Sequence, residues 1–439
     1  MCRWCLVFCL AFGSLALADW PQWRGINRDG GSEDSPPLRE SLPDDGLEPL
    51  WLNKEVISGG RGEGWSSPVV ARGKVYLATI GPAKDKPEFR NEHLVCLNAE
   101  TGKELWRHIR ESKKTKFPQS CTPTVVDNHV YHLGAGLTAL CVDAATGDEV
   151  WQTQLSEEVN EECWMSSPVV VDGVLIVFAQ RLAGLDAQSG EVRWTGKDSV
   201  KEGVYGSPTV FESAEGNLVI AHVGQGDTVA VQPRSGAEQW REKTEAINSS
   251  PVIHKDLLIT LGNSRKGGLR CYRLSNDGPE LQWKYQKIAD PGSSPVVVDE
   301  HVFVQGERQL ACLRLEDGKQ MWTESLDFKD PRYTSLVAAD GKVFYALESL
   351  FTFAADSTEF RLLYRGLFNR QGLLAEEKVH RERLGLNQVN VSLEGETEAD
   401  KKWRQAMEVG PVACTSPAIS DGRLFVRLRS GLACYQLSK

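Results

Sequence analysis

Short segments in which apolar and polar residues alternate follow one another along most of the chain. Apolar stretches such as Val75-Tyr76-Leu77 and Val302-Phe303-Val304 each follow a polar turn. Further turns of this kind are Asp172-Gly173 and Asp340-Gly341. Alternation with a period of two, in short segments bounded by Asp and Gly, predicts β-strands joined by hairpins. The pattern therefore indicates an all-β protein.

A repeated element of two small residues, usually hydroxyl-bearing, then proline and apolar residues opens each unit of this pattern. It occurs as Ser66-Ser67-Pro68, Cys121-Thr122-Pro123, Ser166-Ser167-Pro168, Gly206-Ser207-Pro208, Ser249-Ser250-Pro251, Ser293-Ser294-Pro295 and Thr415-Ser416-Pro417, with the degenerate copy Thr334-Ser335-Leu336. Most units close with a glycine turn and a tryptophan, as in Gly102 to Trp106 and Gly147 to Trp151. Four strands per unit, at a spacing of about 40–45 residues, are typical of β-propeller blades.

The two ends of the chain complete the count of blades. The last unit, from Thr415 to Lys439, has only three strands and no tryptophan, whereas residues 47–52 form a lone strand that contains Trp51. Joining them in one blade closes the ring and removes exposed sheet edges. We therefore expect an eight-bladed β-propeller of four-stranded antiparallel blades over residues 47–439, closed by an N-terminal strand that joins the C-terminal blade.

Three segments lie outside this repeat. Residues 19–46 form an N-terminal extension, and residues 366–412 form an insertion between blades seven and eight. Within the insertion we expect short helices over Leu373–Leu384 and Ala399–Met407. The connection from Gly81 to His93 in blade one is also long, and long excursions from a regular scaffold are often functional.

The regular tryptophans and cysteines are explained by packing. A blade cannot bury its faces alone, so an outer-strand tryptophan packs against the neighbouring blade. The third-strand slot takes a small residue, which is cysteine at Cys96, Cys141, Cys271, Cys312 and Cys434, and Gly184, Ala230 or Ala354 in other blades. Cysteines at equivalent positions around a ring are too far apart for disulfides. Pairing among Cys121, Cys163 and Cys414, which precede inner strands, stays an open alternative.

The first eighteen residues have the features of a signal peptide. Arg3 is followed by the apolar run Leu6–Leu17, and Ala16-Leu17-Ala18 is a small-x-small cleavage signal. Asp19, not a cysteine, follows, so we do not expect a lipoprotein. We expect the mature chain to be secreted or periplasmic, because no other segment is apolar enough to span a membrane.

The charge of the chain limits its partners. The formal net charge is −10 with a sequence pI near 5.5. A diffuse acidic balance argues against nucleic acid as the main partner, because such a partner needs a basic surface. We expect a monomer with a protein or peptide partner.

The best candidate for a binding surface is the mouth of the propeller funnel, where the loops before the inner strands meet those between the second and third strands. These loops carry aromatic residues and arginines, which are frequent at recognition surfaces. The alternative, that they are ordinary solvated loop residues, remains open. The selected residues are Arg61, Glu63, Trp65, Trp164, Tyr205, Asn248, Arg265, Arg308, Arg332, Tyr333 and Arg429.

The segment Leu97–Trp106 resembles the tryptophan-docking repeat of pyrroloquinoline-quinone-type (PQQ-type) propellers, and the resemblance covers nearly the whole mature chain. That repeat is shared by quinone-dependent dehydrogenases and by non-catalytic binding propellers of the BamB type, which assist outer-membrane assembly. The opening Asp19–Gly25 is similar to secreted quinoprotein-like propellers of planctomycetes. The resemblance implies a propeller fold and a choice between these two functions.

We expect the binding function. The quinone enzymes hold their cofactor with adjacent cysteines, which this chain lacks, and with a Ca²⁺ ion for which no compact acidic cluster is evident. No nucleophile elbow, phosphate loop or paired-histidine metal motif occurs. The prediction is a scaffold without cofactor, metal or catalytic residues. A PQQ- and Ca²⁺-dependent alcohol or sugar dehydrogenase is the alternative, and a carbohydrate-binding propeller is a weaker one.

Overall fold

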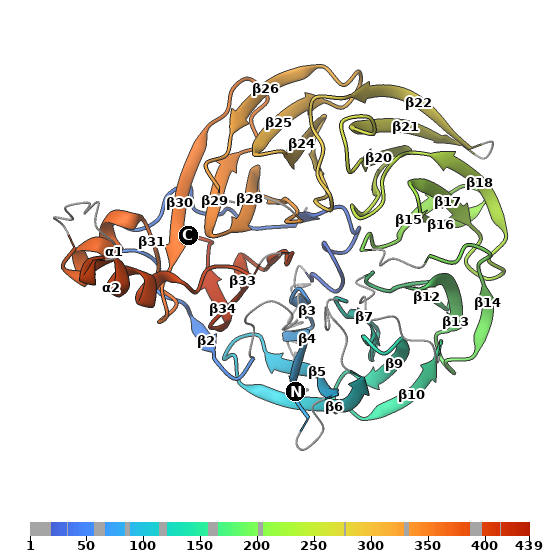
Figure 1. Cartoon of the computed structure of the whole chain (residues 1–439), viewed down its shortest axis with the longest axis horizontal. Helices are drawn as coiled ribbons and strands as arrows, with labels where there is room; N and C mark the ends of the chain where they lie inside the picture. Colours follow the sequence, from blue (N-terminus) through green and yellow to red (C-terminus); the bar gives the residue numbers. More distant parts are fainter. Residues whose placement is uncertain are drawn as a thin grey trace, which may run out of the picture.

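The computed structural model describes residues 19–32, 34–56, 66–83, 88–113, 121–156, 166–200, 205–275, 278–328, 333–386, 397–412 and 414–439. Within these ranges the strands form eight sheets that surround a central axis (Figure 1). Seven sheets have four strands, and the sheet of blade seven has six. The all-β, eight-bladed propeller expected from the repeat is confirmed.

Each blade runs from an inner strand at the axis to an outer strand at the rim. The inner strands are β3 (Val69–Ala71), β7 (Thr124–Val126), β11 (Val169–Val171), β15 (Thr209–Ser213), β19 (Val252–His254), β23 (Val296–Val298), β27 (Val337–Ala339) and β32 (Ala418–Ser420), for blades one to eight. The second strands are β4 (Lys74–Pro82), β8 (His129–Leu133), β12 (Val174–Ala179), β16 (Gly216–Val223), β20 (Leu257–Leu261), β24 (His301–Gly306), β28 (Lys342–Leu347) and β33 (Arg423–Leu428).

The third and fourth strands follow in the same order. The third strands are β5 (Phe89–Asn98), β9 (Thr138–Asp143), β13 (Arg181–Asp186), β17 (Asp227–Val231), β21 (Leu269–Ser275), β25 (Gln309–Arg314), β29 (Ser349–Ala354) and β34 (Gly431–Gln436). The outer strands are β6 (Glu104–Lys113), β10 (Glu149–Gln154), β14 (Val192–Thr195), β18 (Glu238–Lys243), β22 (Gly278–Tyr285), β26 (Gln320–Ser325), β30 (Leu362–Phe368) and β2 (Trp51–Asn53). β2 pairs antiparallel with β34, so the N-terminal strand completes blade eight as expected.

The outer-strand tryptophans join each blade to the next. The indole Nε1 of Trp106 donates to the Ala144 carbonyl of blade two at 3.2 Å, and Trp151 donates to Ala187 of blade three at 3.1 Å. Their rings lie against glycines: a Cβ on Gly147, at φ 76°, would come within 2.6 Å of Trp106. Each glycine turn therefore makes room for an indole as well as permitting positive φ. The packing role predicted for these tryptophans is confirmed.

The hydroxyl residues of the repeated element form a ring of hydrogen bonds around the axis. In each case the backbone N–H of one blade donates to the hydroxyl oxygen of the equivalent residue in the next, and these bonds cross seven of the eight blade boundaries. The pairs are Ser67 to Thr122, Thr122 to Ser167, Ser167 to Ser207, Ser207 to Ser250, Ser250 to Ser294, Ser294 to Ser335 and Ser416 to Ser67, at 2.8–3.0 Å. At the remaining boundary the buried Ser416 Oγ has no partner among the described residues. In blade seven, where Leu336 replaces the proline, Ser335 keeps the hydroxyl and accepts the bond from Ser294.

Residues 19–32, which we call the N-terminal plug, cross the centre of the ring (Figure 1, dark blue). Trp20 is buried and forms a two-way backbone pair with Val70 of blade one. At the other end, β1 (Gly31–Ser32) runs parallel to β27 of blade seven. The plug therefore pairs with inner edges on two sides of the channel, through a single bridge at Val70 and through strand β1 at β27.

Two fully buried arginines fix the plug to the blades. Arg24 donates to the carbonyl oxygens of Ser294, Pro295 and Leu336 in blades six and seven. Arg28 donates to the carbonyls of Ser167 and Pro168 in blade three, at 3.0 and 2.9 Å.

Burial lowers the pKa of Arg24 to about 10 and that of Arg28 to about 9, so both remain cationic at neutral pH. Trp23 adds a bond from its Nε1 to the Ser250 hydroxyl, at 3.1 Å. The sequence predicted an N-terminal extension over residues 19–46, but not that it crosses the ring. The acceptors of Arg24 and Arg28 are backbone carbonyls, and these cannot be recognised from residue types.

The segment between blades seven and eight lies at the rim, on the left of Figure 1. β30 extends to Phe368, and β31 (Leu374–Ala375) pairs with it. α1 (Glu377–Leu384) therefore begins later than the predicted helix over Leu373–Leu384, because the first residues of that range join the sheet. α2 (Glu398–Met407) agrees with the expected helix within one residue.

The cysteines that the structure describes are all free thiols. Cys96, Cys141, Cys271, Cys312 and Cys434 are buried opposite an outer-strand tryptophan, as the packing interpretation requires. In blade seven the slot residue is Thr352, paired with Tyr364, and the prediction of Ala354 was wrong by two residues. Among the described residues, no helix is both long and apolar enough to cross a membrane.

Candidate functional site

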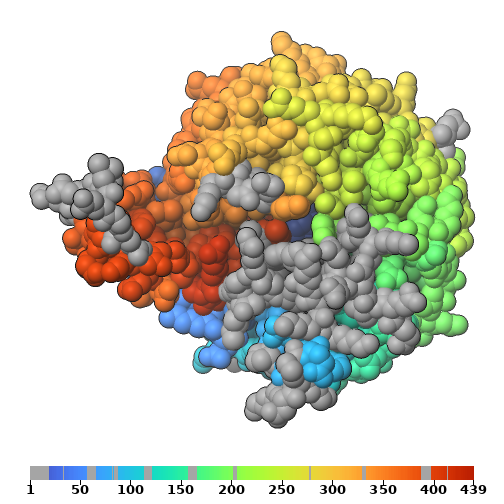
Figure 2. Space-filling model, viewed as in Figure 1, coloured from blue at the N-terminus to red at the C-terminus, as the bar shows by residue number. Residues whose placement is uncertain are grey.

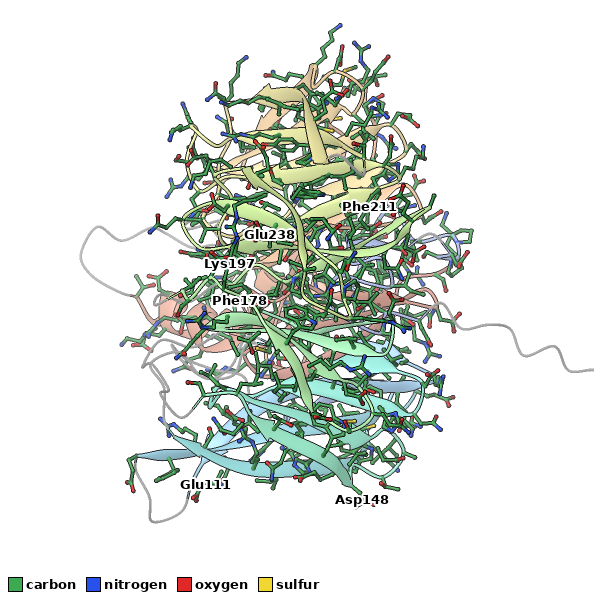
Figure 3. The ribbon with its side chains drawn as sticks, turned by 90° about the vertical axis from the view of Figure 1, so that its right-hand side faces the viewer. Glu111, Asp148, Phe178, Lys197, Phe211 and Glu238 are labelled. Atoms are coloured by element: carbon green, nitrogen blue, oxygen red, sulfur yellow. The ribbon has the colours of Figure 1, made fainter. Side chains whose placement is uncertain are left out.

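The funnel face is the end of the ring where each outer strand leads into the next inner strand and where second and third strands are joined. Figure 3 shows the ring from the side, with Glu111 toward the left-hand face and Asp148, in a turn between third and fourth strands, on the opposite face. In Figure 2 the plug is visible, in dark blue, at the centre of the ring. The plug therefore lies at the floor of the funnel.

Six of the predicted surface residues fall within the described part of the chain, namely Tyr205, Asn248, Arg265, Arg308, Tyr333 and Arg429. Arg61, Glu63, Trp65, Trp164 and Arg332 lie outside the described residues, as does Cys163. The chain topology places the six on the funnel face. Their role in binding remains a prediction.

Tyr333 is the most sharply defined of these side chains. It is 38% exposed, although it is a large aromatic residue, and its backbone has a φ of 63°. Positive φ is rare for a bulky residue and is retained only where the surroundings impose it. Its ring packs over Gly292 of the preceding blade, where an added Cβ would come within 2.4 Å of the ring.

Asp290 holds the Tyr333 backbone in this conformation. The Asp290 Oδ1 accepts from the backbone N–H groups of Gly292 (2.8 Å), Ser293 (2.7 Å) and Tyr333 (3.2 Å). Asp290 is 1% exposed, and burial raises its pKa in spite of these N–H donors. Sequence reasoning missed Asp290; the only signal was its place in the turn Asp290-Pro291-Gly292.

A second residue shares the unusual backbone of Tyr333. Cys414 occupies the equivalent position before the inner strand of blade eight and has a φ of 67°. Burial and the nearby Asp290 carboxylate raise the pKa of the Cys414 thiol to about 12. The thiol is therefore neutral at physiological pH and unsuited to nucleophilic chemistry.

The three described arginines of the funnel face, and Asn248, differ in the bonds that they make. The Arg265 guanidinium of blade five forms an ion pair with Glu307 of blade six, and the Arg265 side chain is 62% exposed. The Arg308 backbone carbonyl accepts from the N–H of Leu326, and the Arg429 backbone N–H donates to Gly410 at 3.2 Å. Arg429 is exposed, so its side chain faces solvent from an anchored backbone. The Oδ1 of the half-buried Asn248 is a buried atom with no described partner.

The carboxylates, cysteines and histidines of the described residues were compared with what a Ca²⁺ site requires. No three His, Cys, Asp or Glu side chains among them are arranged to hold a metal ion. The buried Glu92 is engaged by Arg110 at 2.7 Å and by Ser112 at 3.0 Å. Ca²⁺ needs six to eight converging oxygen ligands, and the described carboxylates form no cluster of three or more.

The chain is similar to known propellers over most of its length. A family model described as outer membrane protein assembly factor BamB matches residues 52–140 and 90–324. The outer membrane protein assembly factor BamB of Burkholderia pseudomallei (strain K96243) is 24% identical over 218 residues, which cover 46% of this chain and only 55% of that relative.

Two solved structures are similar in fold. BamB from Moraxella catarrhalis has a TM-score of 0.52 at 13% identity and covers 81% of this chain and 92% of its own. A europium-containing methanol dehydrogenase has a TM-score of 0.58 at 12% identity, with 79% of this chain and 85% of its own covered. At these identities the two similarities establish the propeller and do not distinguish a binding protein from an enzyme.

Proposed function

The chain belongs to the family of the outer membrane protein assembly factor BamB, and on this premise we propose that it is a non-catalytic scaffold that binds a protein or peptide partner at its funnel face. We further propose that it acts outside the cytoplasm after removal of residues 1–18, with the outer-membrane assembly machinery as the class of partner. The scaffold works as a monomer, without quinone or metal.

The observation that carries this proposal is the presentation of Tyr333. Exposed aromatic side chains that are held rigid lose little conformational entropy on binding, and they are frequent in binding hot spots. Asp290 fixes the Tyr333 backbone through a 3.2 Å bond, and Gly292 leaves room for its ring. Arg265, which is paired with Glu307, and the exposed Arg429 lie in other loops of the same face.

Photo-crosslinking in cells tests the partner. Benzoylphenylalanine is placed at Tyr333, and a matched control carries it at the exposed Ser235 in the glycine turn of blade four, on the opposite face. We expect a discrete adduct with an outer-membrane assembly component at Tyr333 and none at Ser235. Equal adducts at both positions, or none at Tyr333, would contradict the funnel-face proposal.

A second experiment separates the scaffold from the quinone enzyme that shares its fold. Melting of the purified chain is followed with and without pyrroloquinoline quinone and Ca²⁺, together with dye reduction on alcohols and sugars. Binding to the folded state alone would raise the melting temperature. We expect no shift and no dye reduction, whereas a shift of several degrees with turnover would overturn the scaffold proposal.

A further inference from the structure

A cavity of about 940 Å³ lies beside the N-terminal plug, on the face opposite the funnel. One wall is the plug itself, at Ile26, Arg28 and Asp29, and the others come from the inner strands of blades three, four and five. Phe211, which lines it, lies toward the right-hand side in Figure 3. No residue of the predicted funnel surface is among its described lining residues, so the cavity is separate from the candidate site.

The inner strand of each blade has one residue whose backbone polar groups face the axis. It is the third residue after the ring hydroxyl, and its alignment with the second strand leaves both its N–H and its C=O directed away from that strand. In blade one this residue is Val70, which exchanges two 2.8 Å bonds with Trp20 of the plug. Val125 of blade two donates to Pro21, and Ala338 of blade seven donates to Gly30, each at 2.8 Å. We call these three the plugged positions.

The same position is open in the blades that surround the cavity. It is Val170 in blade three, Val210 in blade four and Ile253 in blade five, and each has the strand register of the plugged positions. All three line the cavity. Among the described residues, no group bonds to their backbone N–H. Unpaired strand edges of this kind are templates for an added strand.

The residues that line the cavity indicate what kind of peptide segment it would bind. Ile26 of the plug is 63% exposed and faces the cavity together with apolar residues of the open edges. Glu212 and Asp29 supply carboxylates to the rim, and Glu212 is exposed. The other charged groups of the lining have partners: Arg28 donates to carbonyls of blade three, Lys255 pairs with Glu300, and Asp256 pairs with Arg273. Glu212 is the exposed lining carboxylate that has no ion pair within the described residues. Apolar walls beside this carboxylate complement a strand with alternating apolar and basic side chains.

We propose that this cavity binds an extended segment of a partner protein, with alternating apolar and basic side chains, by strand addition to the inner edges of blades three to five. The plug is the internal precedent, because Trp20 and Pro21, adjacent in sequence, pair with the adjacent blades one and two. Successive residues of one extended chain therefore reach successive inner edges. This site is independent of the funnel face, and either proposal can fail alone.

Peptide binding with residue-specific hydrogen exchange tests the site. The probe is a fluorescein-labelled decapeptide of alternating Val and Lys, and its control alternates Val and Glu. We expect saturable binding of the Lys peptide only, with exchange at Val170, Val210 and Ile253 slowed about tenfold or more. The plugged positions should stay protected with and without peptide. Unchanged exchange at the three open positions overturns strand addition, and open positions already protected in the free chain would assign the cavity to another part of this chain.

Two matched pairs of variants locate the interaction. Glu212→Lys should weaken the Lys peptide roughly threefold to tenfold and favour the Glu peptide, whereas Glu215→Lys, on the same hairpin outside the cavity, should change neither. Val210→Pro removes an N–H that the sheet does not use and should abolish binding. Val297→Pro, at the same position of blade six, is its control for folding. Equal losses in a variant and its control would contradict the proposal.

Discussion

The backbone N–H of Ser416, in the last blade, donates to the Oγ of Ser67, in the first, at 2.9 Å. This bond joins the last blade to the first across 349 residues of sequence. The repeated hydroxyl residue is thus explained by a single bond geometry that recurs at blade boundaries, and the bond is shielded from water because these residues are buried. Its loss at any one boundary leaves a buried N–H without an acceptor.

Ser250→Ala should lower the free energy of unfolding by about 1–3 kcal/mol, because the Ser207 N–H and the Trp23 indole lose their acceptor. Denaturant unfolding measures the change. Ser416→Ala is the matched control, since its Oγ occupies the same ring position without a described partner. A loss at Ser416 as large as that at Ser250 would show that the hydroxyls act by packing alone.

Arg24→Met should destabilise the chain by about 3 kcal/mol or more, because several buried carbonyl oxygens lose a charged donor at once. Thermal unfolding is the measurement. Arg314→Met serves as the control, because its ion pair with Asp317 is exposed and should be worth less than about 1 kcal/mol. Comparable losses would mean that the plug contributes no more than a surface contact.

The buried His222 should make the fold sensitive to acid. Burial lowers its pKa to about 3, below the ordinary value of 6.5, so the unfolded chain takes up a proton first as the pH falls. Stability from this group is present above pH 6.5 and is lost toward pH 3. His222→Leu should remove about 2 kcal/mol of the stability difference between pH 7 and pH 5. Unfolding at both pH values checks this, and an unchanged difference would contradict it.

Asp290 should show the opposite dependence. Burial raises its pKa, so its contribution to stability is fully present below the unfolded pKa and falls as the pH rises through the folded one. Asp290→Asn keeps an oxygen for the three backbone N–H donors and should lose this decline. Melting temperatures between pH 4 and 8 measure it, and a decline of wild-type size in the variant would exclude Asp290 as its source.

Gly147→Ala should destabilise the chain more than Gly73→Ala, by about 1–3 kcal/mol. Both glycines have positive φ, 76° and 71°, so backbone strain is similar. Only at Gly147 would the new Cβ meet an indole, that of Trp106, whereas Gly73 has nothing within 4 Å. Calorimetry of the two variants compares them directly, and equal losses would contradict a role for the indole contact.

The repeat made most of the fold predictable from sequence, because strands, turns and docking tryptophans recur at fixed spacing and reinforce one another. The predictions were wrong where the pairing of strands in the folded chain differs from what the local sequence pattern suggests. Residues Leu374 and Ala375 fit a helix by composition, yet they pair with β30 and shorten α1. In blade seven the strand pairing puts Thr352 opposite Tyr364, so the small-residue slot lies two residues before Ala354.

The candidate site was predictable only as a face of the propeller. Topology assigns the loops that bear Arg265 and Tyr333 to one end of the ring, but nothing in the sequence indicates that Asp290 fixes the Tyr333 backbone. Its partners are main-chain N–H groups, which every residue but proline possesses. The same reason hid Arg24, whose acceptors are carbonyl oxygens of residues 294, 295 and 336.

The plug also constrains the order in which the chain can fold. Arg24 and its acceptor Leu336 are 312 residues apart. Synthesis begins at the N-terminus, so Arg24 is made long before the carbonyl of Leu336 that it binds. The bonds of Arg24 to blade seven can form only after that blade has folded, and a chain truncated before blade seven lacks these acceptors. Residues synthesised at the start of the chain are thus fully seated only after about three hundred further residues have been made.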